Sequence, residues 1–313
     1  MLGRTANDLY WMARYVERAE NMARLLEVGQ RLSLLTHESG DSEWRSTLRS
    51  AGCEEGYLTK HGVYESDKVI EFLLLDRNNP SSVCSCFDAA RRNARAQRTA
   101  ITREMWESLN TAWIALASRA RPRMKANELP PLFDWVRDRS ALFRGAFLNT
   151  ILRNDTFFFT QLGTFLERAD NTARILDVKY YVLLPQNELV GGGVDSAQWA
   201  AILRSVSAHR SFRWVYRDTF KPWHIAEFLM LSPEMPRSLR SCYIEITGAL
   251  AGLADHYGQT SSCLELAQRT LKTLEHGEMT AIFQSGLHEF LSDFISNNNR
   301  LANEIAATYH FND

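Results

Sequence analysis

The stretch Arg14-Tyr15-Val16-Glu17-Arg18-Ala19-Glu20-Asn21-Met22-Ala23-Arg24-Leu25-Leu26 is the key to this chain, because a close copy of it recurs. The copy is Phe165-Leu166-Glu167-Arg168-Ala169-Asp170-Asn171-Thr172-Ala173-Arg174-Ile175-Leu176. Four polar identities share one offset of 150 residues, as 167 minus 17 shows for the glutamates. Packing alone would repeat Leu and Ala. The repeated Glu, Arg and Asn therefore indicate a duplicated unit with a polar role of its own.

Two further segments recur at nearly the same offset. Trp44–Ser50 matches Trp199–Ser205, an offset of 155 (199 minus 44), and Glu71–Asp76 matches Glu227–Ser232, an offset of 156 (227 minus 71). The repeat unit is half the chain, which is too long for a short-period solenoid. We therefore predict an all-α, internally duplicated helical bundle with two pseudo-symmetric halves, residues 1–131 and 132–313, packed as one domain.

Helical periodicity dominates the chain, and no convincing β-type alternation occurs. Thr5-Ala6-Asn7-Asp8 resembles a helix start, and the first helix is expected to run to about Leu35. Its apolar residues share one side and its charged residues the other. We also expect Pro80 to enter a helix, residues 121–131 to be a linker, and helices over 133–152 and 280–309.

Composition limits the classes of function. The 313 residues are 45% hydrophobic and 23% charged, with a net charge of −1, so no strong attraction to nucleic acid or anionic lipid is expected. Five cysteines are an odd number without the density of a disulfide scaffold, which favours a reduced, cytoplasmic setting. The apolar runs are too short to span a membrane. We expect a soluble cytoplasmic protein that binds neither nucleic acid nor membrane.

The two charged motif faces are the first candidate site. On a single helix such a face is ordinarily solvated, with ion pairs worth a few tenths of a kcal/mol. Two faces brought together could line a groove for a zwitterionic or carboxylate ligand, or could form a salt-bridge clasp between helices, and buried charges would then need full pairing. Both interpretations stay open, and the catalytic residues are unknown. The residues concerned are Glu17, Arg18, Glu20, Asn21, Arg24, Glu167, Arg168, Asp170, Asn171 and Arg174.

An arginine stripe is the second candidate, as a surface for a partner protein. It consists of Arg91, Arg92, Arg95 and Arg98, and an offset of 156 places Thr247, Ala251 and Ala254 opposite three of these positions. The stripe therefore belongs to one half only. Arginine binds carboxylate or phosphate through two parallel hydrogen bonds, so an acidic partner or peptide is expected. The alternative is an ordinary solvated face.

Metal and cofactor chemistry have weak support. Cys84 and Cys86 lack a second ligand pair at zinc spacing, so buried small side chains are the better interpretation. Gly191-Gly192-Gly193 lacks the strand and the Lys-Ser/Thr of a phosphate-binding loop. A carboxylate metal site in a helical bundle could still combine Glu17 with Glu167. We expect no metal and no cofactor.

The sequence resembles the Alpha-E domain family, an all-helical group named for its Glu-Arg motif. The resemblance rests on Arg14–Leu26, Asp76–Arg98, Phe165–Tyr180 and Glu227–Leu239, and it covers essentially the whole chain. Members are typically encoded beside, or fused to, circularly permuted ATP-grasp proteins and transglutaminase-like proteins. The resemblance implies an accessory protein of a peptide or amide ligation or peptide-modification system. An enzyme with a site between the motif helices, and a structural scaffold, are the alternatives.

Overall fold

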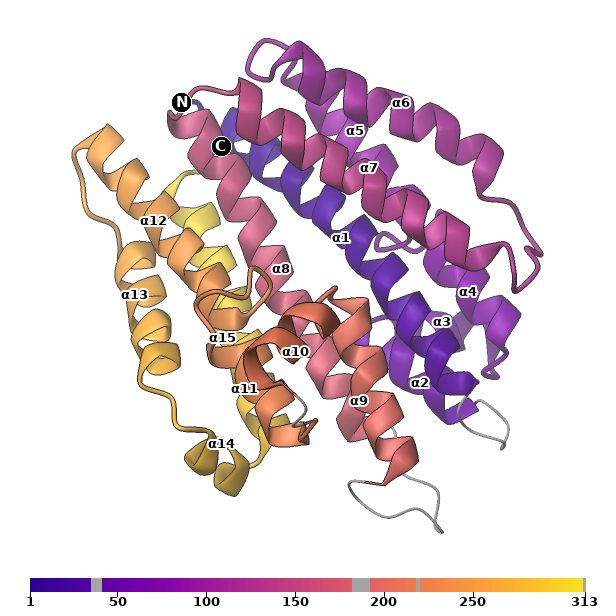
Figure 1. Cartoon of the computed structure of the whole chain (residues 1–313). Helices are drawn as coiled ribbons and strands as arrows, with labels where there is room; N and C mark the ends of the chain where they lie inside the picture. The colour runs from indigo at the N-terminus through magenta and orange to yellow at the C-terminus, as the bar shows by residue number, and fades with distance from the viewer. Residues whose placement is uncertain (35–40, 182–191, 218–219, 312–313) are drawn as a thin grey trace.

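Two long helices, α1 (Gly3–Ser33) and α8 (Asp155–Tyr181), lie side by side through the middle of the molecule and make its most extensive helix contact (Figure 1). The computed structural model describes residues 1–34, 41–181, 192–217 and 220–311. Within these ranges the chain forms helices α1 to α15 and contains no strand, so the all-α prediction is confirmed. Each motif stretch lies in one of the two central helices.

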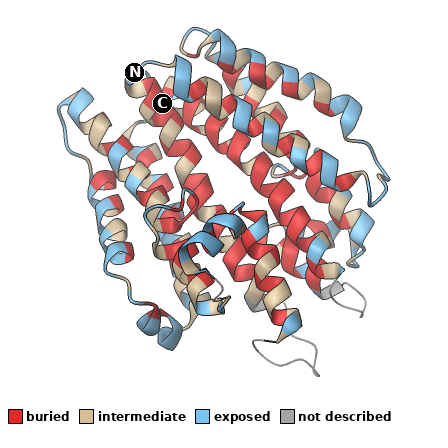
Figure 2. Cartoon of the chain, viewed as in Figure 1, coloured by how far each residue is buried: buried red, intermediate tan, exposed pale blue. Residues whose placement is uncertain are grey.

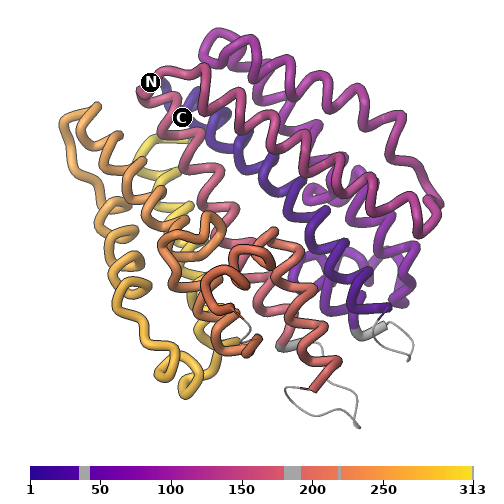
Figure 3. Tube along the Cα trace, viewed as in Figure 1, coloured from indigo at the N-terminus to yellow at the C-terminus, as the bar shows by residue number. Residues whose placement is uncertain are grey.

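The helices between α1 and α8 cover α1. Helices α5 and α7 pack directly on α1, and α6 packs on both of them from outside. The tube in Figure 3 shows this part of the chain, indigo to magenta, on one side of α8. The helices are α2 (Asp41–Ser50), α3 (Glu54–His61), α4 (Ser66–Leu74), α5 (Val83–Ala96), α6 (Arg103–Arg119) and α7 (Leu129–Thr150).

The helices after α8 cover α8 from the other side. Helices α12 and α15 pack directly on α8, and α13 packs on both of them. Contacts also cross between the groups, since α2 touches α8 and α9 touches α1. The helices are α9 (Gly193–Ser205), α10 (His209–Tyr216), α11 (Pro222–Leu231), α12 (Leu239–Tyr257), α13 (Ser262–Glu275), α14 (Met279–Ser285) and α15 (Leu287–Thr308).

Gly163 allows α1 and α8 to approach closely. A Cβ atom at this position would lie 2.1 Å from the carbonyl oxygen of Tyr10 and 3.2 Å from the Cβ of Ala13. The first of these contacts is with backbone, which cannot swing aside. Any larger residue would therefore push the two central helices apart, and with them the motif side chains.

Helix α1 is buried on nearly every side, because 20 of its 31 residues are buried, including Arg14, Glu17, Glu20 and Arg24 (red in Figure 2). The charged face of α1 is therefore not solvated, as such a face ordinarily is on a single helix. Helices from both groups cover this face, since α7 lies on one part of it and α8 and α9 on others. Its charges need partners within the protein.

Several helix ends differ from the predicted ones. Helix α1 begins at Gly3 without a side-chain cap, so Thr5 lies in the first turn. Ser82 rather than Pro80 starts α5, because its hydroxyl accepts a hydrogen bond from the amide of Ser85. The predicted helix over 280–309 is two helices, since Gly286 adopts φ 101° between them. In the glycine run, Gly192 is the N-cap and Gly193 the first residue of α9, whereas Gly191 lies outside the described residues.

Candidate functional site

Glu17 of α1 lies at the centre of a buried group of arginines. Arg168 of α8 donates from Nε and Nη2 to the two carboxylate oxygens, at 3.0 and 3.1 Å. Arg237 and Arg144 each add a hydrogen bond of 3.0 Å through Nη1. The carboxylate is only 1% exposed. Both oxygens of Glu17 are therefore fully engaged, by side chains from three different parts of the chain.

Glu20 lies one turn along and shares two of these arginines. Arg24 donates to it from Nε at 3.0 Å and from Nη2 at 2.6 Å. Arg144 and Arg237 complete the shell with further hydrogen bonds. We call this set the Glu17 cluster, and it consists of Glu17, Glu20, Arg24, Arg144, Arg168 and Arg237.

Glu167 of α8 is the counterpart in the second motif, and its arginines come from α1. Arg18 donates from Nε at 2.6 Å and from Nη2 at 2.9 Å, and Arg14 donates from Nε at 2.8 Å. Nearby, Asp170 accepts from Arg174 at 2.6 Å. We call this set the Glu167 cluster, and it consists of Arg14, Arg18, Glu167, Asp170 and Arg174.

The Glu-Arg pairs are thus reciprocal across the α1–α8 contact. Each glutamate accepts two hydrogen bonds from the motif arginine of the opposite helix, Arg168 in one direction and Arg18 in the other. The last motif arginines also reach across, because Arg24 donates to the carbonyl of Ser205 and Arg174 donates to that of Ser50 at 3.5 Å. The structure therefore brings the two predicted motif faces together.

The two motif asparagines are buried but incompletely hydrogen-bonded within the protein. Asn21 donates at 3.4 Å to the carbonyl of Glu167, while its Oδ1 has no partner among the described residues. Asn171 Nδ2 also lacks a protein acceptor among them. A buried water molecule would satisfy such atoms at small cost.

The arginines decide the protonation of the buried carboxylates. Burial by itself would raise the pKa of Glu20, but Arg237, Arg144 and Arg24 outweigh it and lower the pKa to about 2. Burial is likewise outweighed at Glu167, where Arg18 and Arg14 lower the pKa to about 2. The pKa of Glu17 is also lowered well below its usual value, because Arg168, Arg237 and Arg144 overcome burial. All three are ionised at neutral pH.

The Glu17 cluster carries more positive than negative charge, with four arginines against two glutamates. Burial, together with the repulsion from Arg237, lowers the pKa of Arg24 to about 10. Sequence reasoning missed two of these arginines, Arg144 and Arg237. Arg144 lies in the middle of α7 outside any repeated segment, and Arg237 stands where the first half has Ser81. The replacement of this serine by arginine in the second half was the only signal in the sequence that could have pointed to Arg237.

The chemistry open to this arrangement is narrow. A general acid or base works best with a pKa near the operating pH, and these carboxylates titrate far below it. The side chains of Glu17, Glu20 and Glu167 are also buried, and each of their carboxylate oxygens already accepts a hydrogen bond from an arginine. The geometry suits a rigid electrostatic contact between helices better than proton transfer.

The arginines of the stripe differ in their partners and in their position relative to α5. Arg91 donates to Asn110 Oδ1 at 2.8 Å, and Arg92 pairs with Asp88 at 3.2 Å. Arg95 and Arg98 are exposed, but Arg98 follows the end of α5 rather than continuing its face. Its guanidinium lies 4.7 Å from the ring centre of Trp106. The stripe is thus a mixed surface with three exposed arginines, of which Arg92 is ion-paired with Asp88.

Other candidate chemistry finds little support in the described part of the chain. No group of three or more His, Cys, Asp or Glu residues there could hold a metal ion. Cys84 and Cys86 are buried, and burial raises the pKa of both thiols. No helix within the described ranges is long and apolar enough to cross a membrane.

Two mycobacterial proteins are similar to part of this chain. Uncharacterized protein Mb2597 of Mycobacterium bovis and Uncharacterized protein Rv2567 of Mycobacterium tuberculosis are each 32% identical to this chain over 133 residues. The match covers 38% of this chain but 15% of those proteins, which are much longer. None of the solved structures matches.

A family model described as a predicted alpha-helical domain with a conserved ER motif matches residues 1–310. The dipeptide Glu-Arg occurs twice in this chain, as Glu17-Arg18 and as Glu167-Arg168. These are the reciprocal pairs of the two clusters. The protein belongs to the Alpha-E family.

Proposed function

We propose that this protein is a non-catalytic helical accessory protein, in which the Glu-Arg motifs form a clasp and an outer face binds a partner. The observation that carries the clasp is the complete pairing of Glu17, Glu20 and Glu167 in a buried setting. Breaking such a buried pair typically costs about 3–5 kcal/mol, which is large against the total stability of a domain. An enzyme site between the same helices would need an accessible, titrating group.

We also infer that the clasp joins two duplicated halves. Helix α1 contacts α2, α4, α5 and α7, and α8 contacts α9, α11, α12 and α15, in the same order along the chain. Ser140 of α7 donates to the carbonyl of Val16, while Asn298 of α15 donates to that of Leu166, 150 residues further on. These matches support a junction between α7 and α8, near residue 152, in place of 131.

Co-expression of two fragments tests that junction. Residues 1–152 with 153–313 should associate into a helical complex, because each fragment keeps its own covering helices. Residues 1–131 with 132–313 should associate less well, since α7 is then separated from α1 and α6, on which it packs. Equal recovery of both pairs would remove the argument for the junction at 152.

The proposed partner surface is the basic face around α5 and α6. Residues 77–125 contain ten Arg and Lys against three Asp and Glu, a net charge of +7 in a chain of net charge −1. Arg95 and Arg98 are exposed there. Such a field attracts an acidic surface and speeds its encounter. The partner class that the Alpha-E resemblance implies is a circularly permuted ATP-grasp protein of a peptide or amide ligation system, with an acidic peptide or a transglutaminase-like protein as alternatives.

Binding to the ATP-grasp protein of the same organism tests this proposal. We expect micromolar association that weakens at least about tenfold when Arg95 and Arg98 are both replaced by Ala. The matched control replaces the exposed Arg269 and Arg300, which lie on α13 and α15. Absence of association at about 10 μM, or equal loss in both double variants, would contradict the proposed surface.

A further inference from the structure

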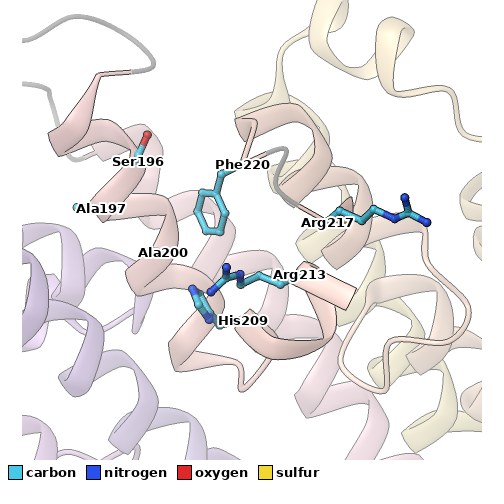
Figure 4. A pocket seen from close by; sticks show the side chains of 7 residues that line it. All are labelled: Ser196, Ala197, Ala200, His209, Arg213, Arg217 and Phe220. Atoms are coloured by element: carbon cyan, nitrogen blue, oxygen red, sulfur yellow. The ribbon is translucent and has the colours of Figure 1, made fainter. Parts of the chain in front are cut away.

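A hollow of about 350 Å³ opens between α9, α10 and the ring of Phe220 (Figure 4). This volume is within the range of small-molecule sites, which begins near 300 Å³. Two alanines on α9 leave the space open. The lining residues are Ser196, Ala197, Ala200, His209, Arg213, Arg217 and Phe220.

Among the described residues the lining is cationic and contains no carboxylate. Residues 204–221 carry five Arg and Lys against one Asp, a net charge of +4. Arg213 and Arg217 are exposed, and within the described ranges neither forms an ion pair. They differ in this from the motif arginines, all of which already hold a carboxylate.

Aromatic packing beneath the surface holds the residues around the hollow in place. Phe212 of α10 is fully buried, and its ring centre lies 5.3 Å from that of Phe220 and 5.7 Å from that of Phe228. The ring of Phe220 in turn lies 5.9 Å from His209. In Figure 4 the Arg213 side chain extends toward His209 beneath the Phe220 ring, while Arg217 points away at the rim. A flat ring and a cation donor therefore face one small space.

The electrostatic environment of His209 fits an incoming negative charge. Burial, together with Arg204 and Arg213, lowers the pKa of this imidazole. Arg204 and Arg213 add their repulsion to the effect of burial, so the described surroundings of His209 carry an excess of positive charge. An anion entering the hollow would relieve that excess.

We propose that this hollow binds a small ligand that carries an oxyanion, either phosphate or carboxylate, on a flat apolar group. Arg213 supplies a fork of N–H donors to the oxyanion, and His209 supplies a further polar contact. The Phe220 ring packs on the flat group. The site is separate from the clasp and from the basic face of α5 and α6, so it does not depend on either.

Titration of the full chain with four probes tests the ligand class. Phenyl phosphate and benzoate carry both features, inorganic phosphate lacks the ring, and phenol lacks the charge. Ligand-observed NMR or calorimetry should give a Kd below about 1 mM for phenyl phosphate or benzoate, with inorganic phosphate at least about tenfold weaker and phenol not bound. Absence of saturable binding of both ring anions up to about 10 mM would overturn the proposal.

Two arginines of the same helix provide a matched pair of variants. Arg213→Ala should weaken binding of the ring anions at least about tenfold, whereas Arg210→Ala should change it less than about twofold. Both residues are exposed on α10, but only Arg213 lines the hollow. Equal losses would mean diffuse attraction to surface charge and would also overturn the proposal. Unchanged melting temperatures of both variants establish that each is folded.

A vesicle experiment distinguishes the two sources of such a ligand. Vesicles of phosphatidylcholine with phosphatidic acid present a phosphate headgroup, and pure phosphatidylcholine vesicles are the control. Phenyl phosphate binding without vesicle binding supports a free ligand. Retention on the phosphatidic acid vesicles but not on the pure phosphatidylcholine vesicles supports a headgroup in the same hollow. This retention should be lost in Arg213→Ala and kept in Arg210→Ala.

Discussion

The Glu17 cluster and the Glu167 cluster are built from the same motif but lie in different surroundings. Glu17 and Glu20 recruit Arg144 and Arg237 from outside the motif, and every member of this cluster except Arg144 is buried. Glu167 relies on Arg14 and Arg18 of α1, and Arg18 is 20% exposed. The difference shows that the motif supplies one reciprocal Glu-Arg contact in each direction. The arginines added around that contact differ between the two clusters.

The two clusters also differ in charge. The Glu17 cluster holds four arginines to two acids and the Glu167 cluster three to two. A surplus of buried arginine is tolerated because each guanidinium still donates to a carboxylate or a carbonyl oxygen. Removal of an acid should therefore be more harmful in the Glu17 cluster, where the surplus of positive charge is larger.

Acid is expected to have the largest effect, and it acts on both clusters. The folded-state pKa of Glu20 and of Glu167 is about 2, against an ordinary value of 4.5. Their stabilisation is fully present above pH 4.5 and is lost as the pH falls toward 2, by about 3 kcal/mol for each carboxylate. Urea unfolding at pH 7, 4.5 and 3 measures it. Glu20→Gln and Glu167→Gln should each remove a similar share of this pH dependence.

Replacement of single glutamates at neutral pH should separate the clusters. Glu17→Gln keeps the shape of the side chain but leaves Arg168, Arg144 and Arg237 with less negative charge, and should cost about 3–5 kcal/mol. Glu167→Gln should cost about 2–3 kcal/mol, because only two arginines, Arg14 and Arg18, donate to this carboxylate. Urea unfolding at pH 7 gives both values. A cost below about 1 kcal/mol at Glu17 would favour a ligand site over a clasp.

Double-mutant cycles compare the reciprocal pairs directly. Glu17→Gln with Arg168→Met should give a coupling energy of about 2–3 kcal/mol, and Arg18→Met with Glu167→Gln about 1–2 kcal/mol. The order follows from burial, since the Arg168 side chain is 9% exposed and the Arg18 side chain 20%. The reverse order would mean that Arg144 and Arg237 replace part of the interaction between Arg168 and Glu17.

The smallest expected effect concerns the helix-end contacts. Arg24→Met removes hydrogen bonds to Glu20, to the carbonyl of Ser205 and to the hydroxyl of Ser207, and should cost about 2 kcal/mol. Arg174→Met removes a more exposed ion pair with Asp170 and a long hydrogen bond to the carbonyl of Ser50, and should cost about 1 kcal/mol. Thermal unfolding of the two variants side by side checks the difference.

Sequence reasoning reached the parts of this protein that are encoded locally or repeated. Helical periodicity predicted the fold class, and the recurrence of Glu, Arg and Asn at one offset pointed to α1 and α8 as the helices to compare. Burial of the charged face was one of two open outcomes, because a helix pattern cannot tell whether a second helix covers it.

Part of the remainder depended on contacts between distant segments. Nothing local distinguishes Arg144 from other arginines of α7, and its role exists only because α7 crosses Glu17 and Glu20. The end of α5 before Arg98 and the break at Gly286 depended on local backbone geometry that the periodic pattern does not encode.

The spacing of the Glu17 cluster along the chain has a consequence for synthesis on the ribosome. Glu17 emerges early, but Arg144, Arg168 and Arg237 follow 127, 151 and 220 residues later. Domains that fold during translation generally close as soon as their own contacts are complete. Here the first helix cannot bury its acidic residues with all their partners until about three quarters of the chain exists. The nascent chain must therefore keep its central helix open until α12 is about to be made.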